Sequence, residues 1–168
     1  MAILKKIVHI LSYICYFAII VYIAVCIPSI FGYKPLVVLT GSMEPSFKPG
    51  SVIFYEKVEK DEIKEGDIIT FKIDDDTYVS HRVNRIVDGL YETKGDYNNT
   101  PDSEMVSYSN IMGRNINLSI PYIGYYIRYV NDNLFLVMIV IIILVSEFLL
   151  SNLGTVDINN NVEKEKEI

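Results

Sequence analysis

The sequence holds few of the residues that build metal sites and disulfide frameworks. There are two cysteines and two histidines among its 168 residues. Cys15 and Cys26 lie in the first apolar run, where cysteine serves as a small apolar side chain, and they match neither a disulfide framework nor a CxxC zinc motif. His9 lies at the edge of the same run, so His81 is the single histidine of the rest of the chain. We therefore expect no metal site and no cofactor.

Clustered positive charge is missing as well. The 15 lysines and arginines form no block, and the net charge is −6. Because phosphate groups are bound by clustered lysine and arginine, this composition argues against a nucleic-acid partner. The sequence also contains no internal repeat and no low-complexity linker that would divide a domain.

Apolar residues are abundant instead, at 51% of the chain. From Ile7 to Tyr33 no residue carries a formal charge, and lysines flank this run on both sides. A helix of about 20 apolar residues, rising about 1.5 Å each, spans a hydrocarbon core, so the run predicts a transmembrane helix over residues 7–31. Pro28 marks where that helix ends or bends, because an internal proline removes a backbone hydrogen bond. A cleavable signal peptide is the alternative, but its apolar core would span only about 7–15 residues.

A second apolar run covers residues 134–150 and is interrupted only by Ser146 and Glu147. The tyrosine-rich stretch "PYIGYYIRYVNDN" before it resembles the aromatic belt found at membrane interfaces. The run is near the short limit for a spanning helix, and we interpret it as a second transmembrane helix. Membrane lipid is therefore an expected partner of both runs.

Two spans would place both ends of the chain on one side of the membrane. Lys5 and Lys6 favour a cytoplasmic position for residues 1–6. Residues 33–133 would then form an extracytoplasmic domain, because a segment of that length is translocated with little regard to its own charge. Residues 151–168 are polar and charged without periodicity, which is typical of a mobile tail, here on the cytoplasmic side.

The segment between the two apolar runs has the pattern of a mainly β domain. Four stretches are rich in β-branched and aromatic residues, and turn signals such as "KPG", "KEGD", "DDD" and "DG" separate them. Asp88-Gly89 predicts a tight two-residue hairpin, because both residues tolerate positive φ. We therefore expect a hairpin-built antiparallel extracytoplasmic domain between two transmembrane helices, with strands in "SVIFYEKV", "DIITFKI", "TYVSHRVNRI" and "LYETKG".

Three short motifs in this segment carry groups suited to nucleophilic catalysis. Ser42 lies in "TGSMEPSF" after the apolar run 36–39, His81 lies in "YVSHRVNRI", and Asp96 and Asp102 lie in "KGDYNNTPDSE". A serine hydroxyl is a weak nucleophile that needs a base within hydrogen-bond reach, and the base needs a third group to orient it. Taken singly, each residue also fits a structural role: a turn serine, a partly buried imidazole, or aspartates that bond their own backbone.

The motifs taken in order, "GSMEP", "SHRV" and then "KGD" with a second aspartate six residues on, resemble signal peptidase I. The resemblance is to the branch found in archaea, in endospore-forming bacteria and in the endoplasmic-reticulum signal peptidase complex. It extends from the first apolar run through "PYIGYYI" and includes Gly113-Arg114. It implies a membrane-bound serine endopeptidase that removes signal peptides from exported preproteins and cleaves after small residues in an Ala-x-Ala-like pattern.

The same resemblance implies roles for individual residues. Ser42 would be the acylating nucleophile and His81 the general base, in place of the lysine of the main bacterial branch. Asp102 would be the third catalytic member, and Asp96 a second aspartate that holds the loop or supports the histidine. Thr40 would bind the oxyanion together with the backbone N–H of Ser42. The strand that presents the substrate cleft would consist of Leu36, Val37, Val38 and Leu39.

Two other interpretations remain open at this point. One is a catalytically silent, membrane-anchored β-domain that acts as a scaffold or substrate-binding subunit. The other is a Ser-Lys dyad, which would need a lysine near position 81, because Arg82 stays protonated and cannot act as a base. The sequence also leaves open whether an additional membrane subunit is a partner.

Overall fold

The structure is a computed structural model that describes residues 2–74, 77–133, 135–149 and 151. The chain divides into two compact units. One unit is Ala24–Tyr129, and the other combines Met1–Ile23 with Val130–Ile168. Part of the predicted "DDD" turn, both end residues of the predicted second span and all but the first residue of the predicted tail lie outside the described residues.

The helix α1 spans Ala2–Cys26 and continues as the 3₁₀ helix η1, Ile27–Phe31. The α-helix therefore begins before the predicted span, and Pro28 lies in the first turn of the 3₁₀ segment that follows it. Together they contain the one single helix among the described residues, Lys5–Phe31, that is long and apolar enough to cross a membrane. The prediction of a first transmembrane helix rests on the same two properties, the length and the apolar composition of this segment.

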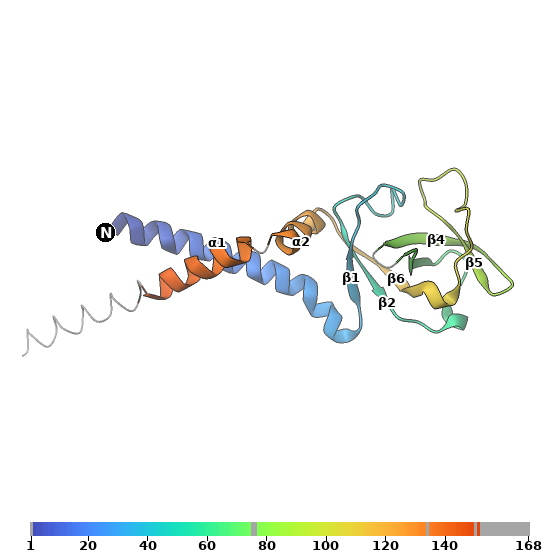
Figure 1. Ribbon diagram of the computed structural model, residues 1–168, viewed down its shortest axis with the longest axis horizontal. Coiled ribbons are helices and arrows are strands. Elements are labelled where there is room, and N and C mark those ends of the chain that lie inside the picture. The colour runs from blue at the N-terminus through green and yellow to red at the C-terminus, as the bar shows by residue number, and fades with distance from the viewer. Residues whose placement is uncertain (1, 75–76, 134, 150, 152–168) are drawn as a thin grey trace, which may run out of the picture. The chain divides into compact units, whose positions relative to one another are not determined.

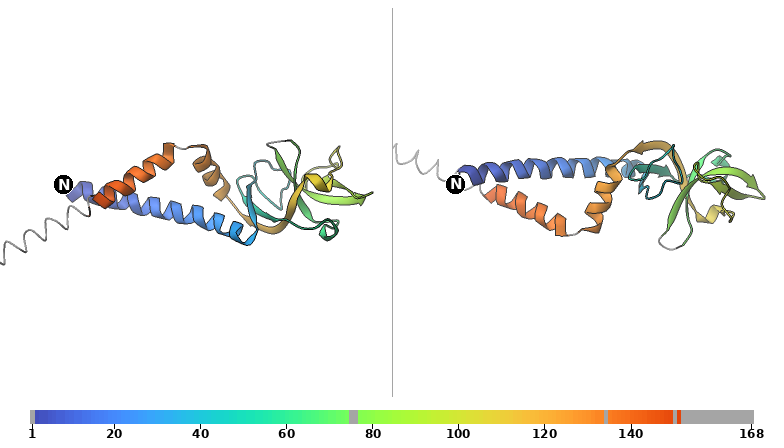
Figure 2. Two further views of the ribbon diagram at one scale, coloured as in Figure 1. Left: turned by 60° about the horizontal axis from the view of Figure 1, so that its bottom comes forward. Right: turned by 90° about the horizontal axis from the view of Figure 1, so that it is seen from above.

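The second apolar run forms a helix over Phe135–Leu149. By length and composition it qualifies as a membrane span only when it is joined with the preceding helix α2, Ile123–Asp132, across a break. The end of this helix lies beside the first half of α1 in both views of Figure 2. Contacts within this unit include His9 Nδ1–Glu147 Oε1 at 3.1 Å, Tyr16 Oη–Glu147 Oε2 at 3.3 Å and Tyr22 Oη–Asn131 Oδ1 at 3.1 Å.

The other unit is built on a six-stranded sheet in the order β1-β2-β6-β3-β4-β5 (Figure 1). Every neighbouring pair is antiparallel, which confirms the predicted mainly β, antiparallel fold. The four predicted strand stretches match β2 to β5. The six strands are β1 Lys34–Val37, β2 Val52–Glu56, β3 Ile68–Lys72, β4 Tyr78–Val87, β5 Leu90–Lys94 and β6 Ile111–Ile120.

The predicted hairpin at Asp88-Gly89 joins β4 to β5. Both residues have positive φ, 52° and 77°, and Val87 pairs with Leu90 directly across the turn. This is the conformation that a two-residue hairpin needs to match the twist of its strands. The turn prediction is therefore confirmed. Two short 3₁₀ helices lie in the connections between strands: η2 (Lys60–Glu62) between β2 and β3, and η3 (Tyr108–Asn110) between β5 and β6.

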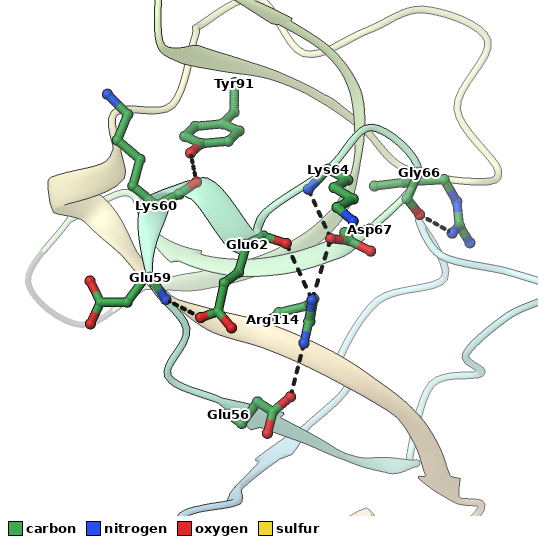
Figure 3. Close-up of polar contacts among 10 residues, drawn as sticks. Glu56, Glu59, Lys60, Glu62, Lys64, Gly66, Asp67, Tyr91 and Arg114 are labelled. Carbon is green, nitrogen blue, oxygen red and sulfur yellow. Dashed lines mark hydrogen bonds and ion pairs between the residues drawn. The ribbon is translucent and has the colours of Figure 1, made fainter.

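Strand β6 was not predicted, although it lies at the centre of the sheet between β2 and β3. Its sequence, "IMGRNINLSI", contains glycine and asparagine, which are depleted in strands. Gly113 is required there, because a Cβ would lie 2.2 Å from the backbone oxygen of Glu56. The next residue, Arg114, links β6 to neighbouring segments through the Glu56 carboxylate at 3.2 Å, the Glu62 carbonyl at 3.3 Å and the Asp67 carboxylate at 3.9 Å (Figure 3).

Two buried apolar clusters hold the sheet in place. One includes Ile69 and Phe71 of β3 and Val83 of β4, and the partly buried Val79 packs against it. The other surrounds Ile53 of β2 and includes Met43 and Phe47, with Leu36 and Val38 packed against it. The first cluster anchors the strand that carries His81, and the second anchors the turn that carries Ser42.

Candidate active site

Ser42 lies in a turn that the second apolar cluster anchors on one side. The strand β1 ends at Val37, not at Leu39 as predicted, because its partner strand β2 begins only at Val52. Val38 still pairs with the backbone of the next turn, whereas Leu39 is 61% exposed. The chain then turns, and Met43 and Phe47 are buried at 3% and 4% exposure. Burial of these two side chains holds the serine between them and the end of the strand.

His81 comes from the middle of β4, where it pairs with Ile69 of β3. The residue is 8% exposed, and its ring meets the ring of Phe71 edge-on at a centroid distance of 6.4 Å. Alternation along the strand places Val79, His81 and Val83 on one face, as predicted from the period of two. The imidazole is thus buried against an aromatic neighbour on the same face of the sheet.

The structure brings Ser42, His81 and Asp102 into a chain of side-chain contacts. Ser42 Oγ lies 3.1 Å from His81 Nε2, and His81 Nδ1 lies 2.7 Å from Asp102 Oδ2. A neutral imidazole with its proton on Nδ1 donates to the carboxylate and accepts from the serine hydroxyl. This arrangement meets the geometric requirement for a nucleophile, a base within reach and a group that orients the base.

Asp96 lies apart from this chain and contacts Arg82. The guanidinium donates from Nε to Asp96 Oδ1 at 2.8 Å and from Nη2 to Oδ2 at 2.7 Å, and Ser46 Oγ donates to Oδ2 at 2.5 Å. These hydrogen bonds, those from Arg82 first, lower the pKa of Asp96 below its ordinary value. The paired geometry is the strong, bidentate form of an arginine–carboxylate contact.

The opposite faces of β4 explain why the two aspartates have different partners. His81 and Arg82 are consecutive residues of one strand, so their side chains point to opposite faces. Lys94 pairs directly with Arg82 across β4 and β5 and therefore shares its face. The nearest lysine in register thus lies on the face away from His81, which weighs against a Ser-Lys dyad.

The "KGD" loop is also tied to the serine turn through the backbone. The N–H of Tyr97 donates to the carbonyl of Ser42 at 2.9 Å. A Cβ at Gly95 would lie 2.6 Å from the same carbonyl oxygen, so only glycine permits this approach. The glycine of the motif therefore keeps the aspartate-bearing loop in contact with the serine turn.

Thr40 is exposed two residues before the serine. Its hydroxyl lies 3.4 Å from Ser42 Oγ, at the long limit of a hydrogen bond. The Thr40 hydroxyl is thus a polar group beside the Ser42 hydroxyl.

Sequence reasoning missed three side chains that support the site. Ser46 and Arg82 hold Asp96, and Thr93 donates a hydrogen bond to Asp102 Oδ2 at 2.6 Å. Arg82 belongs to the "SHRV" motif and Thr93 precedes the "KGD" motif by one residue, but residue type alone does not indicate that their hydrogen-bond partners lie 14 and 9 residues away. Within the described ranges, no group of three or more histidine, cysteine, aspartate or glutamate residues is arranged to hold a metal ion.

Comparison with known proteins places the sequence of this chain in a family. A family model described as signal peptidase, peptidase S26, matches residues 10–97, more than half of the 168 residues. The chain belongs to the signal peptidase S26 family. The match includes the residues corresponding to the serine turn, the histidine strand and the "KGD" motif, and it ends before Asp102. The resemblance seen in the sequence also pointed to Asp102, and the structure shows its contact with His81 in this signal peptidase family member.

Named relatives come from bacteria and from eukaryotes. Signal peptidase I W of Bacillus subtilis (strain 168) is 39% identical over 99 residues, which are 56% of this chain and 52% of that protein. The signal peptidase complex catalytic subunit SEC11C of Homo sapiens is 32% identical over 110 residues, 58% of this chain and 57% of that protein. This family member thus spans about half the length of these relatives.

Proposed function

We propose that this chain is a membrane-bound serine endopeptidase that removes N-terminal signal peptides from exported preproteins. The observation that carries the proposal is the contact chain from Ser42 Oγ through His81 to the Asp102 carboxylate, at 3.1 Å and 2.7 Å. The names of its relatives, signal peptidase I W and a signal peptidase complex catalytic subunit, support signal peptides as the substrate class.

In the proposed reaction, Ser42 Oγ attacks the carbonyl carbon of the scissile bond while His81 Nε2 takes the hydroxyl proton. The tetrahedral intermediate collapses when the C–N bond breaks, and the same nitrogen returns the proton to the leaving amine. A water molecule, activated by the neutral His81, then hydrolyses the ester and regenerates the serine. Asp102 accepts the hydrogen bond from Nδ1 and stabilises the imidazolium formed in each half-reaction.

Negative charge on the attacked carbonyl oxygen needs donors, and we assign that role to Thr40 and to the backbone N–H of Ser42. The Thr40 hydroxyl lies 3.4 Å from Ser42 Oγ, so it adjoins the atom that attacks the carbonyl. Donors placed where charge develops stabilise the transition state more than the ground state. Two donors of this kind form the proposed oxyanion hole.

The free edge of β1 is the proposed binding strand for the substrate. β1 is the first strand in the sheet order, and Val38 bonds the neighbouring turn through its N–H and its carbonyl. Alternation therefore directs the backbone groups of Val37 and Leu39 away from β2. An extended peptide that pairs with this edge would bring its scissile carbonyl toward Ser42. Shallow pockets beside the strand would favour small side chains, in an Ala-x-Ala-like pattern.

Two membrane spans are part of the proposal, with the β domain outside the cytoplasm. The contact of Glu147, near the end of the second apolar run, with His9, near the start of the first, supports an antiparallel second span, and Tyr22 of α1 also contacts Asn131 of α2. Polar side chains in membrane helices commonly face a partner helix in this way. Anchoring beside the substrate's own apolar segment raises its local concentration. The name of the human relative, a catalytic subunit of a signal peptidase complex, supports an additional subunit as a partner.

The test compares the wild-type protein with Ser42→Ala in detergent, using a preprotein as substrate and sequencing the amino terminus of the product. We expect the wild type to release the mature protein and Ser42→Ala to be inactive at an unchanged melting temperature. Ser109→Ala, in the 3₁₀ helix η3, is the matched control and should retain full activity. Turnover by Ser42→Ala near the wild-type rate would end the serine-peptidase proposal. A folded but inactive wild-type protein would instead favour the silent β-domain.

A further inference from the structure

Asp102 accepts a hydrogen bond from a residue outside the proposed catalytic set. Thr93 belongs to β5, and it is 0% exposed. Its hydroxyl donates to Asp102 Oδ2 at 2.6 Å, and that same oxygen lies 2.7 Å from His81 Nδ1. Both distances are within the range of short hydrogen bonds to an ionised carboxylate. One carboxylate oxygen is thus held between the histidine and a buried threonine.

The backbone of Thr93 holds the same aspartate. The N–H of Asp102 donates to the carbonyl of Thr93 at 2.8 Å. Asp102 belongs to no strand or helix, and its side chain is 25% exposed, so its own segment restricts it little. Thr93, in contrast, lies in a paired strand opposite Val83 and on the same face as His81. A rigid strand therefore holds both the main chain and the carboxylate of a loop residue.

We infer that Thr93 is a positioning residue that orients the Asp102 carboxylate toward His81. The inference rests on the proposed function, and it adds a fourth residue that supports the proposed triad of Ser42, His81 and Asp102. A carboxylate rotates about its last side-chain bond over a broad range of angles. A hydroxyl from a buried strand selects the rotation in which Oδ2 faces Nδ1. Because Thr93 is buried and contacts Asp102, its loss should lower kcat and leave KM nearly unchanged.

Four variants separate this role from ordinary packing. Thr93→Val keeps the shape and removes the hydroxyl, while Thr93→Ser keeps the hydroxyl. Thr70→Val is the matched control, because Thr70 is also 0% exposed in the same sheet, and its hydroxyl bonds Ser80 at 2.8 Å. Thr93→Ala is compared with Thr93→Ser, since these two differ only in the hydroxyl; that comparison decides the question if Thr93→Val does not fold.

Cleavage of a preprotein in detergent is the first measurement. We expect Thr93→Val and Thr93→Ala to lower kcat about 10- to 100-fold, the scale of a small misplacement of catalytic groups, with KM within about twofold. Thr93→Ser should stay within about threefold of the wild type. Thr70→Val should keep kcat within about twofold, even if its melting temperature falls as far as that of Thr93→Val.

Proton NMR of the His81 ring is the second measurement, and it needs no catalysis. The chain has two histidines, so a His9→Gln background carried by every sample leaves His81 as the single imidazole. The proton shared between Nδ1 and Asp102 should give a downfield resonance in the wild type, in Thr93→Ser and in Thr70→Val. It should shift or broaden in Thr93→Val and Thr93→Ala.

The outcomes distinguish this inference from the proposed function. A wild-type protein that cleaves no preprotein would contradict the function, while the NMR series would still report whether Thr93 positions Asp102. If kcat and the Nδ1 proton resonance are alike in Thr93→Ala and Thr93→Ser, the hydroxyl has no positioning role and the inference is overturned. It is equally overturned if Thr93→Val behaves as Thr70→Val does in both measurements.

Discussion

The loop after β5 has two ends that each carry an aspartate, and the two ends serve different purposes. At the Asp96 end, a bidentate arginine and a serine hydroxyl surround the carboxylate. At the Asp102 end, the partners are an imidazole and a buried threonine. His81 and Arg82 are consecutive in β4 and point to opposite faces, so the loop contacts both faces of one strand. Both residues are aspartates, so it is the side chain that each contacts that distinguishes the proposed catalytic acid, Asp102, from Asp96, which holds the loop against Arg82.

The largest effect is expected at the Asp102 end. Asp102→Asn should lower kcat by about 10⁴-fold, because an amide cannot stabilise the imidazolium and favours the wrong tautomer of the ring. The measurement is single-turnover cleavage of a preprotein, with circular dichroism as the control for folding. Activity within tenfold of the wild type would remove Asp102 from the proposed triad.

A smaller effect on activity is expected at the Asp96 end. Asp96→Asn should lower kcat only about tenfold, because it weakens the clamp between the "KGD" loop and Arg82 without touching His81. It should also cost about 1 kcal/mol of stability, since the pair is bidentate but the Arg82 side chain is 38% exposed. Both values follow from kinetics and thermal unfolding of the same preparation. A loss of activity greater than that of Asp102→Asn would reverse the assignment of the two aspartates.

The pH dependence of stability should report the Asp96 clamp separately. Hydrogen bonds from Arg82, followed by that from Ser46, lower the pKa of Asp96 in the folded protein. A lowered native pKa adds stability above the unfolded value of about 3.9, and this stability is lost as the pH falls through the native pKa. The melting-temperature gap between wild type and Asp96→Asn should therefore be constant from pH 7 to about pH 5 and close below about pH 4. A gap that widens in acid would contradict the pairing with Arg82.

The smallest effect is expected at the group of ion pairs and hydrogen bonds around Arg114. This guanidinium joins β6 to Glu56, Glu62 and Asp67 (Figure 3). Among the described residues, these three make no hydrogen bond or ion pair with the side chains of the proposed triad. Arg114→Gln should cost roughly 1 kcal/mol or less in unfolding free energy and leave kcat within about twofold. A large loss of activity in folded Arg114→Gln would show that charge networks in this domain affect catalysis without contacting the site.

Local patterns in the sequence predicted much of the sheet. Strands β2 to β5 follow from their β-branched and aromatic residues, and the Asp88-Gly89 turn follows from the positive φ that those residues tolerate. Strand β6 was not predicted because its glycine and asparagines lower the local propensity for β-structure. Pairing with β2 and β3 overrides this low propensity in the folded sheet. The helix α2 was missed in a similar way. It buries Gly124 and Ile127 on one face and exposes tyrosines on another. In the sequence, the many tyrosines indicate an interfacial belt, so the helical spacing of the two buried residues does not stand out.

The candidate site divides along the same line. The sequence by itself determined that one serine motif, one histidine outside the first apolar run and two aspartates were available, because these depend on residue type and order alone. The tertiary structure decided which aspartate contacts the histidine and that Thr93 holds it. Ser42 and Asp102 lie 39 and 21 residues from His81, and no local pattern encodes contacts over such separations. They arise when antiparallel pairing brings distant segments together and the alternation of β4 assigns each side chain to a face.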